Sequence, residues 1–163
     1  MLNGQVALVT GASRGIGAAI ALELGRLGAT VIGTATTGEG AATISAALLA
    51  AGSAGEGVVL EVRDAEQIDA VISHIEKTYG ALSVLVNNAG ITRDNLSMRL
   101  KDDEWESVLD TNLKAVFRLC RAVMRGMMKA RYGRIINVTS VVGHAGNPGQ
   151  ANYCAAKAGV AGM

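Results

Sequence analysis

Tyr153 and Lys157 are the two residues whose types and spacing most directly suggest chemistry. They stand four positions apart near the start of a segment with helical periodicity, so both side chains should project from one face of a helix. An ammonium beside a phenol favours the phenolate and so helps the hydroxyl to exchange a proton near neutral pH. A Tyr and a Lys at this spacing also occur often as a plain surface pair, so the interpretation depends on what lies around them.

Two further polar residues fall at the ends of predicted strands. Ser140 follows a strand predicted over Arg134–Thr139, and Asn87 ends a strand predicted over Leu82–Asn87. Ligands of parallel α/β sheets bind beyond the carboxyl ends of the strands, so we expect both residues beside the Tyr153 phenol. Each could be an ordinary turn former, but together they indicate a hydride-transfer site with a hydroxyl acid.

A glycine-rich turn between the first predicted strand and the first predicted helix suits a pyrophosphate. The free N–H groups and positive dipole end of a helix bind phosphate oxygens there. Gly11 can form the tight turn, Gly15 lets a ligand approach the backbone, and Gly17 lets helix and strand pack closely. The predicted cradle comprises Gly11, Ala12, Ser13, Arg14, Gly15, Ile16 and Gly17.

The end of the second predicted strand favours NADP(H) over NAD. NAD sites of this kind place an acid on the ribose about 20 residues beyond the glycine turn, whereas NADP sites replace that acid and supply a cation. Here no acid occurs until Glu39, and Arg14 lies inside the cradle. A solvated loop charge is the alternative interpretation of Arg14.

The elements that must position these residues alternate between short β-branched runs and longer segments of helical period. This alternation predicts a doubly wound parallel α/β sheet in three αβα layers. Predicted strands are Gln5–Thr10, Thr30–Thr34, Val58–Val62, Leu82–Asn87 and Arg134–Thr139. Predicted helices are Gly15–Leu27, Gly40–Ala51, Ala65–Tyr79 and Asp102–Arg131, with another beginning near Ala151.

Length and composition fit one domain over residues 1–163. A net charge of +1 and few aromatic residues argue against nucleic-acid binding, and no signal peptide or membrane span is evident. The two cysteines match no metal-ligand spacing, so we expect no metal site and a reducing, cytoplasmic location. Because only 18% of the residues are charged, some surface is expected to be buried in an oligomer.

Taken together, these motifs resemble the short-chain dehydrogenase/reductase family. The resemblance rests on Thr10-Gly11-x-x-x-Gly15-x-Gly17, on Asn87-Asn88-Ala89-Gly90, and on Asn112, Ser140 and Tyr153-x-x-x-Lys157. Within the family, the runs 87–95 and 140–157 look most like the bacterial 3-oxoacyl-[acyl-carrier-protein] reductases. The resemblance implies a Rossmann fold and NADPH-dependent reduction of a 3-oxoacyl thioester in fatty acid synthesis.

The resemblance also implies a role for particular residues. Tyr153 would donate the proton, Ser140 would hydrogen-bond the ketone oxygen, Lys157 would hold the ribose, and Asn112 would hold a water of the proton relay. Further cofactor contacts would come from Thr36, Glu61, Val62, Asn87, Ala89 and Gly90, besides Tyr153 and Lys157. Glu61 departs from the Asp or Asn that relatives usually carry near the adenine. Acyl carrier protein would contact Arg131, and the enzyme would be a homotetramer.

Members of this family continue for roughly another half of this length, so the sequence is expected to lack the carboxyl-terminal part of the fold, after the fifth strand. The same chemistry on a coenzyme A thioester such as acetoacetyl-CoA is the nearest alternative. If the polypeptide ends at Met163, a non-catalytic nucleotide-binding fragment of poor solubility is the expectation instead.

Overall fold

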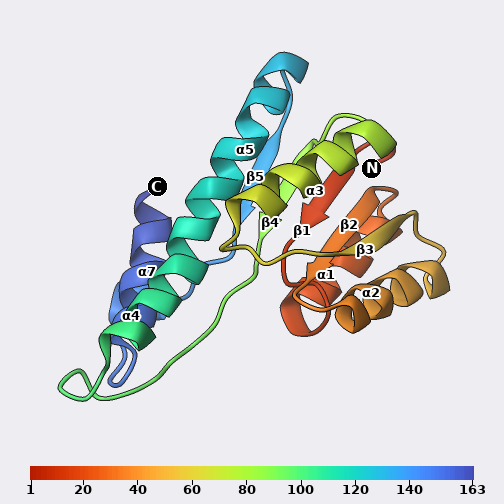
Figure 1. Cartoon of the computed structure of the whole chain (residues 1–163). Coiled ribbons are helices and arrows are strands. Elements are labelled where there is room, and N and C mark those ends of the chain that lie inside the picture. Colours follow the sequence, from red (N-terminus) through yellow and green to blue (C-terminus); the bar gives the residue numbers. More distant parts are fainter.

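A five-stranded parallel sheet lies at the centre of the protein (Figure 1). The computed structural model describes all residues, 1–163. The strands are β1 (Val6–Val9), β2 (Thr30–Ala35), β3 (Gly55–Val59), β4 (Val84–Asn87) and β5 (Arg134–Asn137). Their spatial order is β3-β2-β1-β4-β5, and every neighbouring pair is parallel. The order reverses between β1 and β4, which places a ligand crevice at that point of a doubly wound Rossmann-type sheet.

Helices cover both faces of this sheet. The long ones are α1 (Gly15–Arg26), α2 (Gly38–Ala50), α3 (Ala65–Thr78) and α5 (Ala115–Ala130). The shorter elements are α4 (Asp102–Leu109), the π-helix η1 (Asp110–Lys114), α6 (Val142–Ala145) and α7 (Ala151–Gly162). Side chains that alternate along a strand enter two different cores: Ala7 and Val9 pack with residues of α1 and α2, and Leu8 packs with residues of α3 and α5. The predicted three-layer αβα architecture is confirmed.

Helix α7 lies beyond the carboxyl ends of the strands, next to α4 and α6 (Figure 1). Its position brings Tyr153 and Lys157 to the end of the sheet where the glycine turn after β1 also lies. A short turn and α6 connect β5 to α7. The sequence pattern predicts α7 but not α6. No helix is long and apolar enough to cross a bilayer.

The third strand was predicted three residues too late, over Val58–Val62 instead of Gly55–Val59. The prediction followed the β-branched residues, but register with β2 decides where the strand lies, and it pairs Val31 with Gly55. A Cβ at Gly55 would overlap the main chain of Val31, so glycine permits this close approach. Glu61 and Val62 therefore follow the strand rather than ending it.

The single long helix predicted over Asp102–Arg131 is three elements, α4, η1 and α5. The three elements follow one another without a break in the helical spacing of apolar residues. That spacing therefore does not reveal the wider turn of the π-helix. The π-helix contains Asn112, and such widened turns frequently mark functional sites.

Candidate active site

The turn between β1 and α1 has the glycine conformations and close packing that a phosphate cradle requires. Gly11 and Gly15 adopt left-handed φ angles of +64° and +58°. A Cβ on Gly17 would overlap the Gly11 carbonyl oxygen and the amide nitrogen of Asn88, and a Cβ on Gly11 would lie 2.9 Å from Ala89 Cα. Gly11 thus forms the tight turn, and Gly17 allows the close packing, while the Cβ position of Gly15 is open.

Thr10 and Asn88 fasten this cradle to the loop that follows β4. Thr10 Oγ1 accepts hydrogen bonds from the main-chain N–H groups of Asn88 and Ala89, each at 3.0 Å. The Asn88 carboxamide donates in return to the main-chain oxygens of Thr10 and Gly11, also at 3.0 Å each. Segments almost eighty residues apart in the chain are thus bonded at the switch point of the sheet.

A pocket of about 560 Å³ opens beside the cradle. Ten of the predicted cofactor residues line it, namely Gly11, Ser13, Arg14, Gly15, Ile16, Thr36, Glu61, Val62, Ala89 and Gly90. Ala12, Gly17 and Asn87 lie behind its wall, and Asn112, Ser140, Tyr153 and Lys157 are not part of its lining. The pocket thus corresponds to the nucleotide half of the predicted site, and the predicted catalytic residues lie outside it.

Charge in the pocket favours an anionic ligand. Its lining includes Arg14, Arg63 and Arg93, whereas Glu61 is its one carboxylate. That carboxylate accepts hydrogen bonds from Arg63 Nε at 3.1 Å and Nη2 at 3.0 Å. Hydrogen bonding to Arg63 holds the pKa of Glu61 below its ordinary value, so Glu61 remains ionised and paired. Arg14 and Arg93 form no ion pair with a protein carboxylate.

Lys157 is buried, and its ammonium is hydrogen-bonded to the main chain. Only 5% of its surface is exposed, and its Nζ donates to the main-chain oxygen of Val138 at 2.7 Å. The same Nζ lies 5.7 Å from the centre of the Tyr153 ring. Burial lowers the pKa of Lys157 from its ordinary value, because removal from water penalises the ammonium.

Ser140 reaches the same region through the turn before α6. Its Oγ accepts from the Val142 main-chain N–H at a long 3.4 Å. Gly143 packs against α7, where a Cβ would lie 2.9 Å from the Lys157 carbonyl carbon, and Thr139 Oγ1 donates to that residue's main-chain oxygen at 2.8 Å. The strand end that carries Ser140 is therefore joined directly to the helix that carries Tyr153 and Lys157.

Asn112 is fully buried in the π-helix. Its Oδ1 accepts from the Ile91 main-chain N–H, and its Nδ2 donates to the Ile91 main-chain oxygen, both at 2.8 Å. The side chain thus anchors the loop that lines the pocket.

Asn87 lies beneath the site and is 3% exposed. Its Nδ2 donates to Asn137 Oδ1 at 2.8 Å and contacts Cys120 Sγ at 3.4 Å, while its Oδ1 is buried without a hydrogen-bond partner. The Cys120 thiol is buried with it, and burial raises the pKa of that thiol. The bond between Asn87 and Asn137 thus joins the last residues of β4 and β5.

Comparison with known proteins supports the fold described above. Residues 5–163 match the family described as short chain dehydrogenase. The chain belongs to the short-chain dehydrogenase family. It is 62% identical to the 3-oxoacyl-[acyl-carrier-protein] reductase FabG of Pseudomonas aeruginosa and 58% identical to that of Haemophilus influenzae, over 162 residues in each case. A crystal structure described as a short-chain alcohol dehydrogenase of Sinorhizobium meliloti superposes with a TM-score of 0.94 at 38% identity.

These alignments cover 99% of this chain but only part of each similar protein. The chain spans 66% of the length of each of the two reductases and 64% of the Sinorhizobium meliloti chain. Within that shared part, the short-chain dehydrogenase fold places the turn after β1 and helix α7 at the carboxyl ends of the strands (Figure 1).

Sequence reasoning missed three residues that shape this short-chain dehydrogenase site. Asn88 fastens the cradle, Arg63 pairs with the pocket carboxylate, and Asn152 is fully buried next to Tyr153. The doubled asparagine in 87–88 was a usable signal for the first. Arg63 lies two residues after Glu61, so its pairing was also a local signal. Asn152 depends on contacts with distant segments, which no local pattern shows.

Proposed function

We propose that residues 1–163 form one NADPH-binding domain of a reductase that converts 3-oxoacyl thioesters on acyl carrier protein to 3-hydroxyacyl thioesters. The observation that carries this proposal is the placement of the Tyr153–Lys157 pair at the edge of the sheet that also holds the glycine cradle. The high identity to reductases named for this reaction supports it.

The residues present fit such a cofactor. A Cβ at Gly15 would meet no protein atom, and Gly15 lines the pocket, so a pyrophosphate could approach the backbone there. Arg14 and Thr36 would hold the 2′-phosphate, because both line the pocket and no acid stands at the end of β2. Glu61, Val62, Ala89 and Gly90 would form the adenine and ribose walls, and Tyr153 and Lys157 would bind the second ribose.

The chain's own groups would then carry the proton. NADPH, when bound, supplies the hydride. The Tyr153 hydroxyl would donate its proton to the ketone oxygen, and Ser140 Oγ would hydrogen-bond that oxygen as negative charge develops on it. The Lys157 ammonium would favour the phenolate left on Tyr153, and water held near Asn112 would return the proton.

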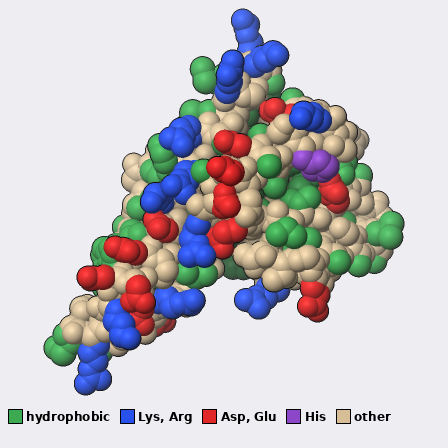
Figure 2. Space-filling model, in the orientation of Figure 1, with side chains coloured by type: hydrophobic (Ala, Val, Ile, Leu, Met, Phe, Trp, Pro, Cys, Tyr) green, Lys and Arg blue, Asp and Glu red, His purple; other side chains and the backbone are tan.

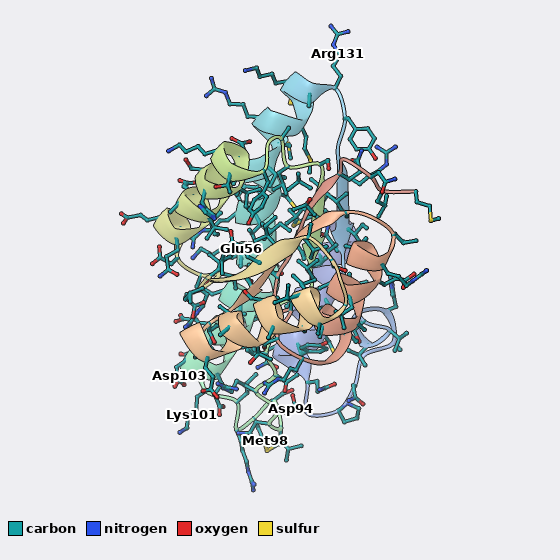
Figure 3. The ribbon with its side chains drawn as sticks, turned by 90° about the vertical axis from the view of Figure 1, so that its right-hand side faces the viewer. Glu56, Asp94, Met98, Lys101, Asp103 and Arg131 are labelled. Atoms are coloured by element: carbon teal, nitrogen blue, oxygen red, sulfur yellow. The ribbon has the colours of Figure 1, made fainter.

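The carrier would be guided by basic residues on α5 and the turn after it. Lys and Arg side chains follow α5 to the top of the molecule, where Arg131 lies (Figures 2 and 3). Arg131 and the loop that carries Asp94 lie at opposite ends of the molecule (Figure 3). Ser140 comes six positions after Arg134 in the chain. At about 3.3 Å per residue, the two ends of this segment are roughly 20 Å apart. Arg131 would therefore bind the body of the acidic carrier. The thioester attached to the carrier would then have to extend from there to the site.

The protein would act as a homo-oligomer, a tetramer by its resemblance to these reductases. Helix α5 exposes Phe117, Met124 and Met128 along one side, and α4 exposes part of Trp105. Apolar surface of this extent on adjacent helices is typical of an interface, and a second copy of the chain would cover it.

The proposal is tested by NADPH oxidation with matched substrates. A 3-oxoacyl group is presented on acyl carrier protein, on coenzyme A and on a short thiol, and each rate is compared with NADH as the reductant. The proposal expects the highest kcat/KM for the carrier with NADPH. A higher value for the coenzyme A thioester would favour the acetoacetyl-CoA reductase alternative, and NADPH binding without oxidation would favour a nucleotide-binding role.

A further inference from the structure

Asn152 precedes Tyr153 in the chain and has no exposed surface. A buried carboxamide needs partners for its oxygen and for both of its N–H groups. Here Oδ1 accepts from the main-chain N–H of Tyr153 at 2.8 Å. Nδ2 donates to the main-chain oxygens of Arg93 at 2.9 Å and Glu104 at 3.3 Å. The carboxamide thus joins the first turn of α7 to two other segments, at Arg93 and at Glu104, and each bond is to the backbone.

The bond to Tyr153 stabilises the start of α7. The first N–H groups of a helix have no partner within the helix, and Gln150, the N-terminal cap of α7, provides no side-chain bond to them. Asn152 supplies the acceptor for Tyr153. The backbone of the residue proposed to donate the proton is therefore held by its neighbour.

The bond to Arg93 reaches the wall of the pocket, because Arg93 belongs to its lining. The loop around Arg93 is fixed on one side by the two hydrogen bonds between Ile91 and Asn112. On the other side, the Asn95 main-chain N–H donates to the Gly149 oxygen at 2.9 Å. The segment 91–95 thus connects the pocket to the start of α7, and Asn152 is its buried attachment.

We propose that Asn152 is a positioning residue, which holds Tyr153 in a fixed place relative to the pocket wall at Arg93. The inference rests on the proposed function, in which Tyr153 is the proton donor. Proton transfer requires the donor to be placed within a fraction of an ångström, and small displacements cost orders of magnitude in rate. Without the carboxamide, the first turn of α7 and the pocket loop lose their buried connection. Only the bonds from Asn95 to Gly149 and from Gln150 to Asp94 then join them.

The experiment compares Asn152→Ala and Asn152→Ser with the wild type and with Asn147→Ala. The Ala variant removes all three bonds, whereas a Ser hydroxyl can still form part of the set. Asn147 is an exposed asparagine of the same segment, and its Nδ2 bonds only the Gln150 side chain, so it is the matched control. Turnover is measured per molecule of NADPH bound, so that unfolded protein does not enter the comparison.

For Asn152→Ala we expect kcat to fall about tenfold or more, with KM for NADPH changed by less than about twofold. Asn152→Ser should be intermediate and Asn147→Ala close to the wild type. Wild-type kcat per bound NADPH in both Asn152 variants would overturn the proposal. So would loss of NADPH binding and turnover in equal proportion, because that result indicates a purely structural role.

A second measurement separates this inference from the proposed function. The protein has three tyrosines, so ring resonances of ¹³C-labelled tyrosine can be assigned by substituting each in turn. The Tyr153 resonances should shift or broaden in Asn152→Ala without any substrate, and Asn147→Ala should leave them unchanged. Unchanged resonances in Asn152→Ala would overturn the positioning role, whereas absent turnover in the wild type alone would count against the proposed reaction.

Discussion

The Lys157 ammonium donates a hydrogen bond to the main-chain oxygen of Val138 at 2.7 Å, which places a buried charge against the end of β5. Val138 lies two residues before Ser140, and Lys157 lies one helical turn after Tyr153. One contact thus joins the two elements that carry the proposed proton donor and its hydroxyl partner. Keeping an ammonium there costs stability, since burial lowers its pKa.

That cost predicts how stability depends on pH. Below the lowered folded pKa of Lys157, both the folded and the unfolded chain carry the proton, and the burial penalty is constant. Between that pKa and the ordinary value of 10.5, the unfolded chain binds more protons, so stability due to Lys157 rises with pH. Urea unfolding of the wild type and of Lys157→Met should be measured from about pH 7 to about pH 10. Over this range, the free energy of unfolding of the wild type should rise relative to that of Lys157→Met. A difference that does not change with pH would contradict the buried ammonium.

The two glycines of the cradle should respond differently to alanine. At Gly17 the new Cβ would overlap the Gly11 oxygen and Asn88, so Gly17→Ala must displace the loop. At Gly15 the Cβ meets open space, and only the left-handed φ of +58° is unfavourable, at a cost of about 1 kcal/mol. Thermal melts should show a larger loss of stability for Gly17→Ala than for Gly15→Ala, and fluorescence titration should show weakened NADPH binding in both variants. The reverse order would show that the packing at Gly17 does not shape the site.

Cofactor preference should depend on Arg14. Its guanidinium can pair with a 2′-phosphate in two hydrogen bonds, so Arg14→Ala should weaken NADPH binding by about 10- to 100-fold and leave NADH nearly unchanged. Arg125→Ala is the matched control, because Arg125 is exposed on α5 and does not line the pocket. Equal losses for both dinucleotides in Arg14→Ala would mean that Arg14 only shapes the loop.

Arg131 allows charge and backbone strain to be separated. It is the one residue other than glycine with a positive φ, +52°, at the end of α5. Arg131→Gly should therefore raise the free energy of unfolding by about 1 kcal/mol and at the same time raise KM for a carrier-linked substrate. Arg131→Glu should raise that KM further without the gain in stability. If KM for a small ketone rises equally, the carrier does not dock at Arg131.

The sequence predicted the features of this fold that are local. Glycine spacing in residues 11–17 and the alternation of short strands with helices were sufficient for the cradle and the parallel sheet. The position of β3 was wrong because Gly55 allows a close approach to Val31, a contact that strand propensity does not measure. The π-helix at Asn112 was missed because apolar periodicity is the same on both sides of it.

The parts of the site that could not be predicted are bonds between distant segments. Asn88 reaches Thr10 across 78 residues, and Asn152 reaches Arg93 across 59. Each bond needs the sheet order to be known first, because the β1–β4 neighbourhood and the position of α7 bring the partners together. A single sequence shows the residue types but not these distances.

The central claim is that Tyr153 donates the proton, and turnover of Tyr153→Phe tests it most directly. The substitution removes only the hydroxyl, so NADPH should bind with a dissociation constant within about threefold of the wild type. Oxidation of NADPH with a 3-oxoacyl carrier substrate at neutral pH should fall by about 10² to 10⁴, the usual contribution of a positioned acid. A wild-type rate in Tyr153→Phe would contradict the assignment and would require another group to supply the proton.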